Sequence, residues 1–368
     1  MPTAEHIENL DGLNVYSLAA ALVYSSANLF QNAPIQMRTA LSMVTDASDV
    51  LSVLLAGNHS VIAGRLVEAF RNIGRDLIAD NILKGMQAAD LKVQEEDPFV
   101  EKVQVSFGRR DVSSYVNRMR LMWAQMRESI IAHFPEQPHQ TIDIETYMAE
   151  VEDKYVTDAY HSLSIEGYRV TRELIELVRS GNWQAEGSDE SKRHLDAMAA
   201  KGYWNAFQEV KKAVLAVLEG KNAGDVLEQT HSDWYLALFG PSGAAGIIKQ
   251  SDLACYRTGP VYIRQSMHTP PSREAVRDMM PTLFDLLAEE ENAAVRVVLG
   301  HFIFVYIHPY FDGNGRMGRF IMNLIMASGG YPWTIVPVTR RDEYMKALEA
   351  ATVKQDIVPF TKFLASLV

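Results

Sequence analysis

The sequence predicts a mainly α-helical protein, and three observations lead to that fold class. Apolar residues recur at helical spacing through most of the 368 residues, with no internal repeat and no low-complexity tract. Proline, glycine and polar residues separate these periodic segments. Residues that favour β-structure gather in one short segment, Arg257–Met267, for which we expect a short hairpin or an extended ribbon.

Helical periodicity is clearest in five segments of the first two thirds of the chain. They cover Ala63–Ala88, Val112–Phe134, Ile142–Ile165, Thr171–Arg179 and Tyr203–Leu218. Turn-forming residues follow several of them, as at Asp97-Pro98, Pro135 and the polar segment 181–191. The segment Phe239–Gln250 carries so many glycines and prolines that we expect no regular element there.

Three helices are expected in the last third. Thr269 is the predicted N-cap of the first, with Pro270 and Pro271 at its start and Glu274 in its first turn. Ala293–Ile307 is apolar on nearly every side, which predicts a central, buried helix. The third, Met317–Ala327, ends at Gly329-Gly330, and the amphipathic stretch 342–368 follows.

The length of the chain suggests two or three structural units. We divide the chain into a helical N-terminal domain at 1–110, a helical region at 111–190 and a core at 191–368. A composition of 48% hydrophobic and 22% charged residues is that of an ordinary globular protein, and the net charge of -11 argues against nucleic acid as the main partner. One cysteine, Cys255, excludes an intramolecular disulfide. We expect a cytoplasmic protein without a membrane span or signal peptide.

Residues 308–319, His-Pro-Tyr-Phe-Asp-Gly-Asn-Gly-Arg-Met-Gly-Arg, form the most informative segment. His308 comes at the end of the predicted buried helix, where Pro309 stops it, and a histidine held there suits a general base. Asp312 offers a hard carboxylate oxygen of the kind that Mg²⁺ takes beside phosphates. A buried structural histidine and an Asx-turn aspartate are the corresponding structural alternatives.

Gly313 and Gly315 permit a tight turn and the close approach of backbone N–H groups to a phosphate at a helix N-terminus. Asn314 adds a side-chain donor. Arg316 and Arg319 share one face, and two cations at the N-terminal end of a helix cost about a few tenths of a kcal/mol. A bound polyphosphate would make this placement of the two arginines favourable. The structural alternative is that both arginines form surface salt bridges. The segment lacks the Gly-Lys-Ser/Thr of a Walker loop, which excludes that motif. It also follows no predicted strand, which excludes a Rossmann fingerprint.

The run His308–Arg319 resembles the signature of Fic-domain proteins, with Tyr310 where phenylalanine is usual; we expect Tyr310 to be a buried anchor of the loop. The resemblance implies a Fic-type helical core and an enzyme that transfers AMP from ATP, with Mg²⁺, to a hydroxyl side chain of a protein. In that light His308 would be the base and Asp312 the metal ligand. The α- and β-phosphates would be bound by Gly313, Asn314, Gly315 and Arg316.

A second match lies upstream. Ser-Leu-Ser-Ile-Glu-Gly at 162–167 resembles the inhibitory motif of the same family, with Ser162 and Glu166 on one helix face and Gly167 after them. The resemblance implies that Glu166 pairs with Arg319, which otherwise holds the γ-phosphate. It also implies that the segment Arg257–Met267 is a flap that aligns the target by strand addition, with Tyr262, Ile263 and Arg264 as the aligning residues.

Other uses of such a site stay open. Removal of AMP with Glu166 positioning a water, transfer of another phosphate-containing group, and a non-catalytic nucleotide-binding regulator are the alternatives to autoinhibited AMP transfer. The partner is expected to be a protein of unknown identity, or the chain itself, and a homodimer is left open.

Overall fold

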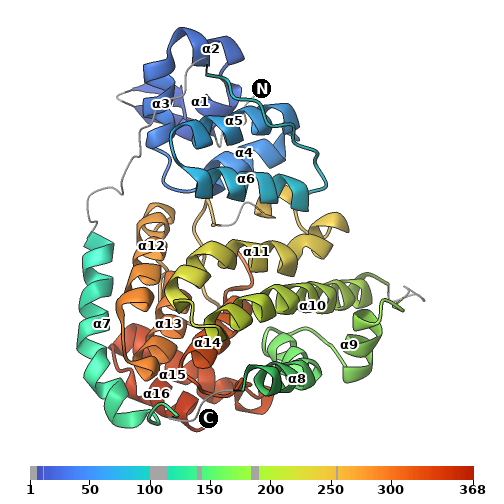
Figure 1. Cartoon of the computed structure of the whole chain (residues 1–368), viewed down its shortest axis with the longest axis vertical. Helices are drawn as coiled ribbons and strands as arrows, with labels where there is room; N and C mark the ends of the chain where they lie inside the picture. Colours follow the sequence, from blue (N-terminus) through green and yellow to red (C-terminus); the bar gives the residue numbers. More distant parts are fainter. Residues whose placement is uncertain (1–5, 11, 100–113, 139–142, 184–189, 254–255) are drawn as a thin grey trace. The chain divides into compact units, whose positions relative to one another are not determined.

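The computed structural model describes residues 6–10, 12–99, 114–138, 143–183, 190–253 and 256–368. Cys255 lies outside these residues. The mainly α-helical fold is confirmed, since the described residues contain one two-stranded sheet beside a long series of helices (Figure 1). The chain divides into two compact units, Met1–Asp111 with Gly243–Thr258, and Val112–Ser242 with Gly259–Val368. None of the described helices combines the length and the apolarity that a membrane crossing requires.

The first unit begins with an antiparallel hairpin and continues with short helices. The strands are β1 (Ile7–Leu10) and β2 (Leu13–Tyr16), paired so that Ile7 faces Tyr16. The helices are α1 (Leu18–Tyr24), α2 (Ala27–Asn32), α3 (Pro34–Ser42), α4 (Ser48–Ala56), α5 (Ser60–Asn72), α6 (Asp76–Ala88) and the 3₁₀ helix η2 (Gln250–Leu253). The predicted single helix over Ala63–Ala88 is therefore wrong. It is interrupted at Gly74, whose φ of 73° is a left-handed conformation that breaks a helix.

The second unit is a bundle of longer helices. They are α7 (Ser114–His133), α8 (Ile144–Ile165), α9 (Arg172–Arg179), α10 (Glu190–Leu218), α11 (Ala223–Ala244), α12 (Arg273–Glu289), α13 (Ala293–Ile307), α14 (Asn314–Ser328), η3 (Val338–Arg340), α15 (Arg341–Lys354) and α16 (Val358–Ala365). Within this unit α13 packs along α14, with α12 and α7 beside α13 and with α10 and α8 beside α14 (Figure 1).

Helix α13 is the centre of this bundle, as its sequence predicts. Asn292 caps it by accepting a hydrogen bond from the backbone N–H of Val295 at 3.1 Å. Apart from Arg296 and Val305, all its residues are buried. Helix α14 is buried almost as completely, from Asn314 to Ala327. The loop between them is therefore fixed at both ends by the core of the unit.

Two predictions at element ends are wrong. Helix α11 runs through Phe239 to Ala244 and contains Pro241, where the sequence predicted an irregular segment. Burial of the apolar face of α11, including Phe239, outweighs the poor helix propensity of its last turn. The N-cap of α12 is Ser272 and not Thr269, because Pro270 would then be the first helical residue, and a residue before proline, here Pro271, is disfavoured in the helical conformation. Glu274 lies in the first turn, as predicted.

Candidate functional site

The loop between α13 and α14 owes its path to two left-handed residues. His308 ends α13 with φ 51° and ψ 60°, and its backbone N–H still donates to the carbonyl of Phe304 at 3.0 Å. Gly313 precedes α14 with φ 81°. A Cβ atom at Gly313 would lie 2.6 Å from the Phe239 ring, so only glycine fits there. The turn of the loop is thus specified by both conformation and packing.

Asn314 and Tyr310 hold the loop in shape. The side-chain oxygen of Asn314 accepts from the backbone N–H of Tyr310 at 2.9 Å, and its amide nitrogen donates to the Tyr310 carbonyl at 2.8 Å. Tyr310 is fully buried, as predicted, and its ring stacks on Tyr235 with centroids 3.9 Å apart and planes 6° apart. The Asn314 side chain therefore shapes the backbone of the loop, a task that the sequence alone did not indicate.

His308 is half-buried at the edge of this loop. Its Nδ1 lies 3.3 Å from the carbonyl oxygen of Val305, one turn back in α13. A carbonyl can only accept, so this contact favours the tautomer with the proton on Nδ1. Nε2 is then the basic nitrogen of the ring, as a general base requires.

Asp312 presents a carboxylate at the start of α14. Its side chain is 65% exposed, one oxygen accepts from the backbone N–H of Gly313 at 2.6 Å, and the other lies 3.3 Å from Nη2 of Arg316. The described residues contain no cluster of three or more acidic, histidine or cysteine side chains fit for a metal. One exposed carboxylate nevertheless fits Mg²⁺, which takes one or two carboxylates and fills its remaining positions with phosphate oxygens and water.

Arg316 is buried and contacts two aromatic rings. Its exposed fraction is 1%, and its guanidinium carbon lies 4.8 Å from the centroid of Phe239 and 5.2 Å from that of Tyr168. Both distances are those of cation–π contacts. Phe239 comes from α11, and Tyr168 follows the end of α8. Arg316 is therefore fixed by two segments outside the loop.

Arg319 is bound to the end of α8. Its Nε donates to the hydroxyl of Ser162 at 2.8 Å, and its Nη2 donates to the Ser162 carbonyl at 3.0 Å and to Oε1 of Glu166 at 2.7 Å. A Cβ atom at Gly315 would lie 2.2 Å from the same Glu166 oxygen. The Glu166 carboxylate is thus packed against the first turn of α14, where a phosphate would otherwise be attracted.

Helix α8 ends so that these groups reach the loop. Asp143 caps its start by accepting from the backbone N–H of Thr146 at 2.9 Å. At its other end Glu166 is the C-cap, and Gly167 follows with φ 92°. The backbone N–H of Tyr168 then donates to the carbonyl of Leu163 at 3.1 Å, as in a Schellman motif. Ser162 and Glu166 are thereby presented on one helix face.

The charges of this pair are stabilised by each other. Burial alone would raise the pKa of Glu166, but Arg319 and Arg316 outweigh it, and the pKa is lowered from its usual value. Burial alone would lower the pKa of Arg319, and Glu166 raises it instead. Both groups are therefore ionised near neutral pH.

A buried carboxylate that the sequence did not single out lies on the same face of α8. Asp158, four residues before Ser162, accepts from the hydroxyl of Tyr203 at 2.9 Å. Its burial raises its pKa to about 6, although Tyr203 and the positive charge of Arg319 act in the opposite direction. The i, i+4 spacing from Ser162 was the one local signal that could have found it.

The flap segment forms no strand among its described residues 256–267. The hairpin of the prediction is therefore absent from these residues, which contain a turn in which the backbone N–H of Ser266 donates to the carbonyl of Ile263 at 3.2 Å. Tyr262 is 83% exposed, Arg264 is exposed and Ile263 is half-buried. The turn is held by a residue of α15. Glu349 of α15 accepts from the Ser266 hydroxyl and from the Met267 backbone N–H.

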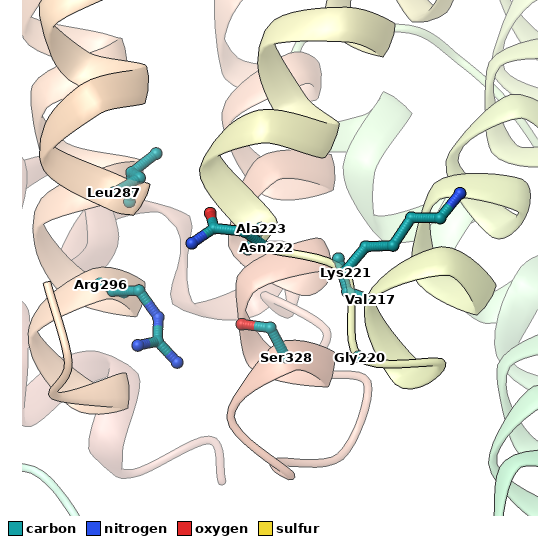
Figure 2. A pocket seen from close by; sticks show the side chains of 8 residues that line it. All are labelled: Val217, Gly220, Lys221, Asn222, Ala223, Leu287, Arg296 and Ser328. Atoms are coloured by element: carbon teal, nitrogen blue, oxygen red, sulfur yellow. The ribbon is translucent and has the colours of Figure 1, made fainter. Parts of the chain in front are cut away.

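A cavity of about 180 Å³ lies at the other ends of α13 and α14 from the loop (Figure 2). It is lined by Val217, Gly220, Lys221, Asn222, Ala223, Leu287, Arg296 and Ser328. None of the predicted site residues is among them. Arg296 already donates to the carbonyls of Glu290 and Glu291, at 2.7 and 3.0 Å. The cavity is thus separate from the loop that carries His308.

Comparison with known proteins points to the same region. Residues 227–326 match the model of the Fic/DOC family. A protein adenylyltransferase Fic from Drosophila willistoni is 28% identical over 219 residues, 58% of this chain and 40% of that protein. The protein adenylyltransferase fic-1 of Caenorhabditis elegans is 36% identical over 113 residues, 30% of this chain and 22% of that protein. The chain therefore spans less than half the length of these relatives.

A solved structure shows the same fold. A glutamate-to-glycine variant of Fic-1 from C. elegans aligns with a TM-score of 0.50 at 18% identity, over 95% of this chain and 94% of that one. At this identity the likeness establishes the fold and leaves the chemistry to be argued from the site.

Proposed function

We propose, from the match of residues 227–326 to the Fic/DOC family model, that the protein is an autoinhibited adenylyltransferase that moves AMP from ATP to a hydroxyl side chain of a protein. One observation carries the proposal. The loop that presents His308 also begins the helix that bears Arg319, and Arg319 is bound by Glu166 at 2.7 Å. A general base, His308, and the N-terminus of α14, which can bind an anion, therefore lie beside a carboxylate of the same chain, that of Glu166.

The transfer assigns a role to each end of the loop. Nε2 of His308 takes the proton of the target hydroxyl, whose oxygen forms a bond to the α-phosphorus of ATP as the bond from that phosphorus to the pyrophosphate oxygen breaks. The backbone N–H groups around Gly313 and Gly315 and the guanidinium of Arg316 bind the α- and β-phosphates. Asn314 keeps the backbone in the required path through Tyr310.

Asp312 is the residue that would hold Mg²⁺, because its carboxylate is exposed beside the phosphate-binding turn. The ion would neutralise charge on the phosphates of ATP. The remaining chemistry belongs to the protein, since His308 moves the proton and the first turn of α14 orients the nucleotide.

Inhibition follows from competition for Arg319. Glu166 supplies a carboxylate where the γ-phosphate of ATP would bind, and the two anions cannot share one guanidinium in the same place. ATP that enters with its γ-phosphate displaced presents its α-phosphorus in the wrong orientation to His308. Removing the Glu166 side chain frees both Arg319 and the space above Gly315.

The test is transfer of label from α-labelled ATP to protein by the purified chain. Glu166→Gly raises the labelling, and adding His308→Ala abolishes it. Glu150→Gly, at an exposed glutamate of the same helix, is the control for a general loosening of α8 and leaves the labelling low. Labelling that is equal in the wild type and Glu166→Gly would show that Glu166 does not inhibit.

The same preparation separates the alternative reactions. The mass of the modified protein distinguishes transfer of AMP from transfer of another phosphate-containing group. Loss of AMP from a modified protein, dependent on Glu166, would favour AMP removal. ATP binding without transfer in any Glu166 variant would favour a non-catalytic regulator.

The flap residues Tyr262, Ile263 and Arg264 are proposed to contact the target, since Tyr262 and Arg264 are exposed. The division at 1–110, 111–190 and 191–368, the cytoplasmic location and the homodimer stay predictions.

A further inference from the structure

The turn after Glu166 touches the second arginine of the site. Tyr168, two residues beyond Glu166, places its ring 5.2 Å from the guanidinium carbon of Arg316. Gly167, with φ 92°, reverses the chain so that Tyr168 points back to the loop. The end of α8 therefore contacts both arginines, Arg319 through Glu166 and Arg316 through Tyr168.

These two contacts have opposite consequences for ATP. The Glu166 carboxylate competes with a phosphate, because both are anions that need the same N–H groups. The neutral Tyr168 ring does not compete in this way, because it attracts the guanidinium without bringing a negative charge that would replace a phosphate. The Phe239 ring lies 4.8 Å from the same guanidinium carbon, so two rings restrict the movement of Arg316.

We infer that Tyr168 is a positioning residue for the proposed reaction, and that it orients Arg316 for the phosphates of ATP by stacking on it. The inference rests on the proposed function. On this account the segment 162–168 both inhibits and supports the site. Its full displacement would then yield a weaker enzyme than loss of the Glu166 side chain alone.

Burial makes the orientation of Arg316 matter. The side chain is 1% exposed, and its direct ionic partner is Asp312 at 3.3 Å, a long contact to a carboxylate that is itself 65% exposed. Such a contact fixes the direction of a guanidinium only loosely. The two rings therefore add to the restraint on its position, and Tyr168 is the one contributed by the inhibitory segment.

The experiment compares Tyr168→Ala and Tyr168→Phe in the Glu166→Gly background, where the competing carboxylate is absent. ATP affinity is measured by calorimetry, and kcat and KM for ATP by labelling. Tyr168→Ala should weaken ATP binding about fivefold and raise KM by a similar factor, whereas Tyr168→Phe keeps the ring and should stay within about twofold of its parent.

The matched control is Tyr160→Ala, because Tyr160 lies within α8 and its ring lies 5.7 Å from the guanidinium carbon of Arg172, an arginine outside the loop at 308–319. It should leave ATP affinity unchanged. Unchanged ATP affinity in Tyr168→Ala would overturn the inference. So would a loss of affinity in Tyr168→Phe or in Tyr160→Ala that is as large as the loss in Tyr168→Ala. So would Tyr168→Ala in the wild-type background if it raised transfer as much as Glu166→Gly does.

Calorimetry tests the role of Tyr168 separately from the proposed function. Absence of transfer in Glu166→Gly would contradict the proposed function, but the affinities of its Tyr168 variants for ATP would still decide whether Tyr168 positions Arg316.

Discussion

Oε1 of Glu166 lies 2.7 Å from Nη2 of Arg319, although 153 positions of sequence separate the two residues. Ser162, one turn before Glu166, binds the same guanidinium through its hydroxyl and its carbonyl. The nucleotide end of the candidate site is therefore built from the start of α14 and the end of α8 together. Changes in α8 should alter ATP binding without touching the loop itself.

Ser162→Ala should relieve part of the inhibition. The substitution removes the hydroxyl that accepts from Nε of Arg319 at 2.8 Å, but it leaves the Ser162 carbonyl and Glu166 in place. A hydrogen bond to a charged group is worth about 1.5–3 kcal/mol, so Arg319 becomes easier to withdraw from α8. Labelling from α-labelled ATP should rise above the wild type and stay below Glu166→Gly. Labelling at or under the wild-type level would contradict this role of the hydroxyl.

Asn314→Ala should destabilise the loop and lower ATP affinity together. It removes the two hydrogen bonds that the Asn314 side chain makes to the buried backbone N–H and C=O of Tyr310, at a cost of about 2 kcal/mol or more in the free energy of unfolding. Asn323→Ala is the control, because Asn323 is equally buried on α14 and bonds the backbone of Thr334 in the same way. Urea unfolding should show similar losses for both variants, and calorimetry a loss of ATP affinity for Asn314→Ala alone.

The helical core was predictable because its local signals agree. Ala293–Ile307 was predicted at its observed bounds, since an all-round apolar segment is followed by Pro309. Residues 239–244 of the segment predicted as irregular are helical because the burial that extends α11 is a tertiary effect. The break of the predicted helix at Gly74 depends on a backbone conformation that periodicity does not reveal.

The site was predictable only where it is local. The run from His308 to Arg319 and the spacing of Ser162 and Glu166 are patterns within a few residues. The roles of Tyr168 and Phe239 could not be predicted in this way, because no local sequence pattern shows that an aromatic residue near a helix end contacts a particular arginine. Their contacts with Arg316 arise when α8 and α11 pack beside α14.

Asp158→Asn should stabilise the protein at pH 7 more than at pH 4. The pKa of Asp158 is about 6 in the folded chain against an ordinary value of 3.8, so the folded state holds the proton more tightly. The contribution of protonated Asp158 to the free energy of unfolding is fully present below pH 3.8 and is lost as the pH rises through about 6. Two pKa units correspond to on the order of 3 kcal/mol.

Urea unfolding of the wild type and Asp158→Asn at both pH values measures this difference. The gain in unfolding free energy from the substitution should grow between pH 4 and pH 6 and stay constant above. The same gain at pH 4 and at pH 7 would show that Asp158 does not titrate in this window.

Glu349→Ala should loosen the flap and leave nucleotide binding intact. Glu349 accepts from the Ser266 hydroxyl and from the Met267 backbone N–H, so its loss frees the turn at 263–266. Limited proteolysis should cut this turn faster, while ATP affinity stays unchanged. Glu343→Ala is the control, because Glu343 lies on the same helix and pairs with Arg340 instead. Equal proteolysis rates in the two variants would exclude Glu349 as the anchor of the flap.

The central claim is that Glu166 and the γ-phosphate of ATP compete for Arg319, and the most direct measurement is the ratio of ADP to ATP dissociation constants. In the wild type Arg319 is occupied, so the third phosphate should add little and the ratio should be near 1. In Glu166→Gly, ATP should bind at least about tenfold more tightly than ADP, and adding Arg319→Ala should remove that preference. The same ratio in the wild type and in Glu166→Gly would contradict the competition.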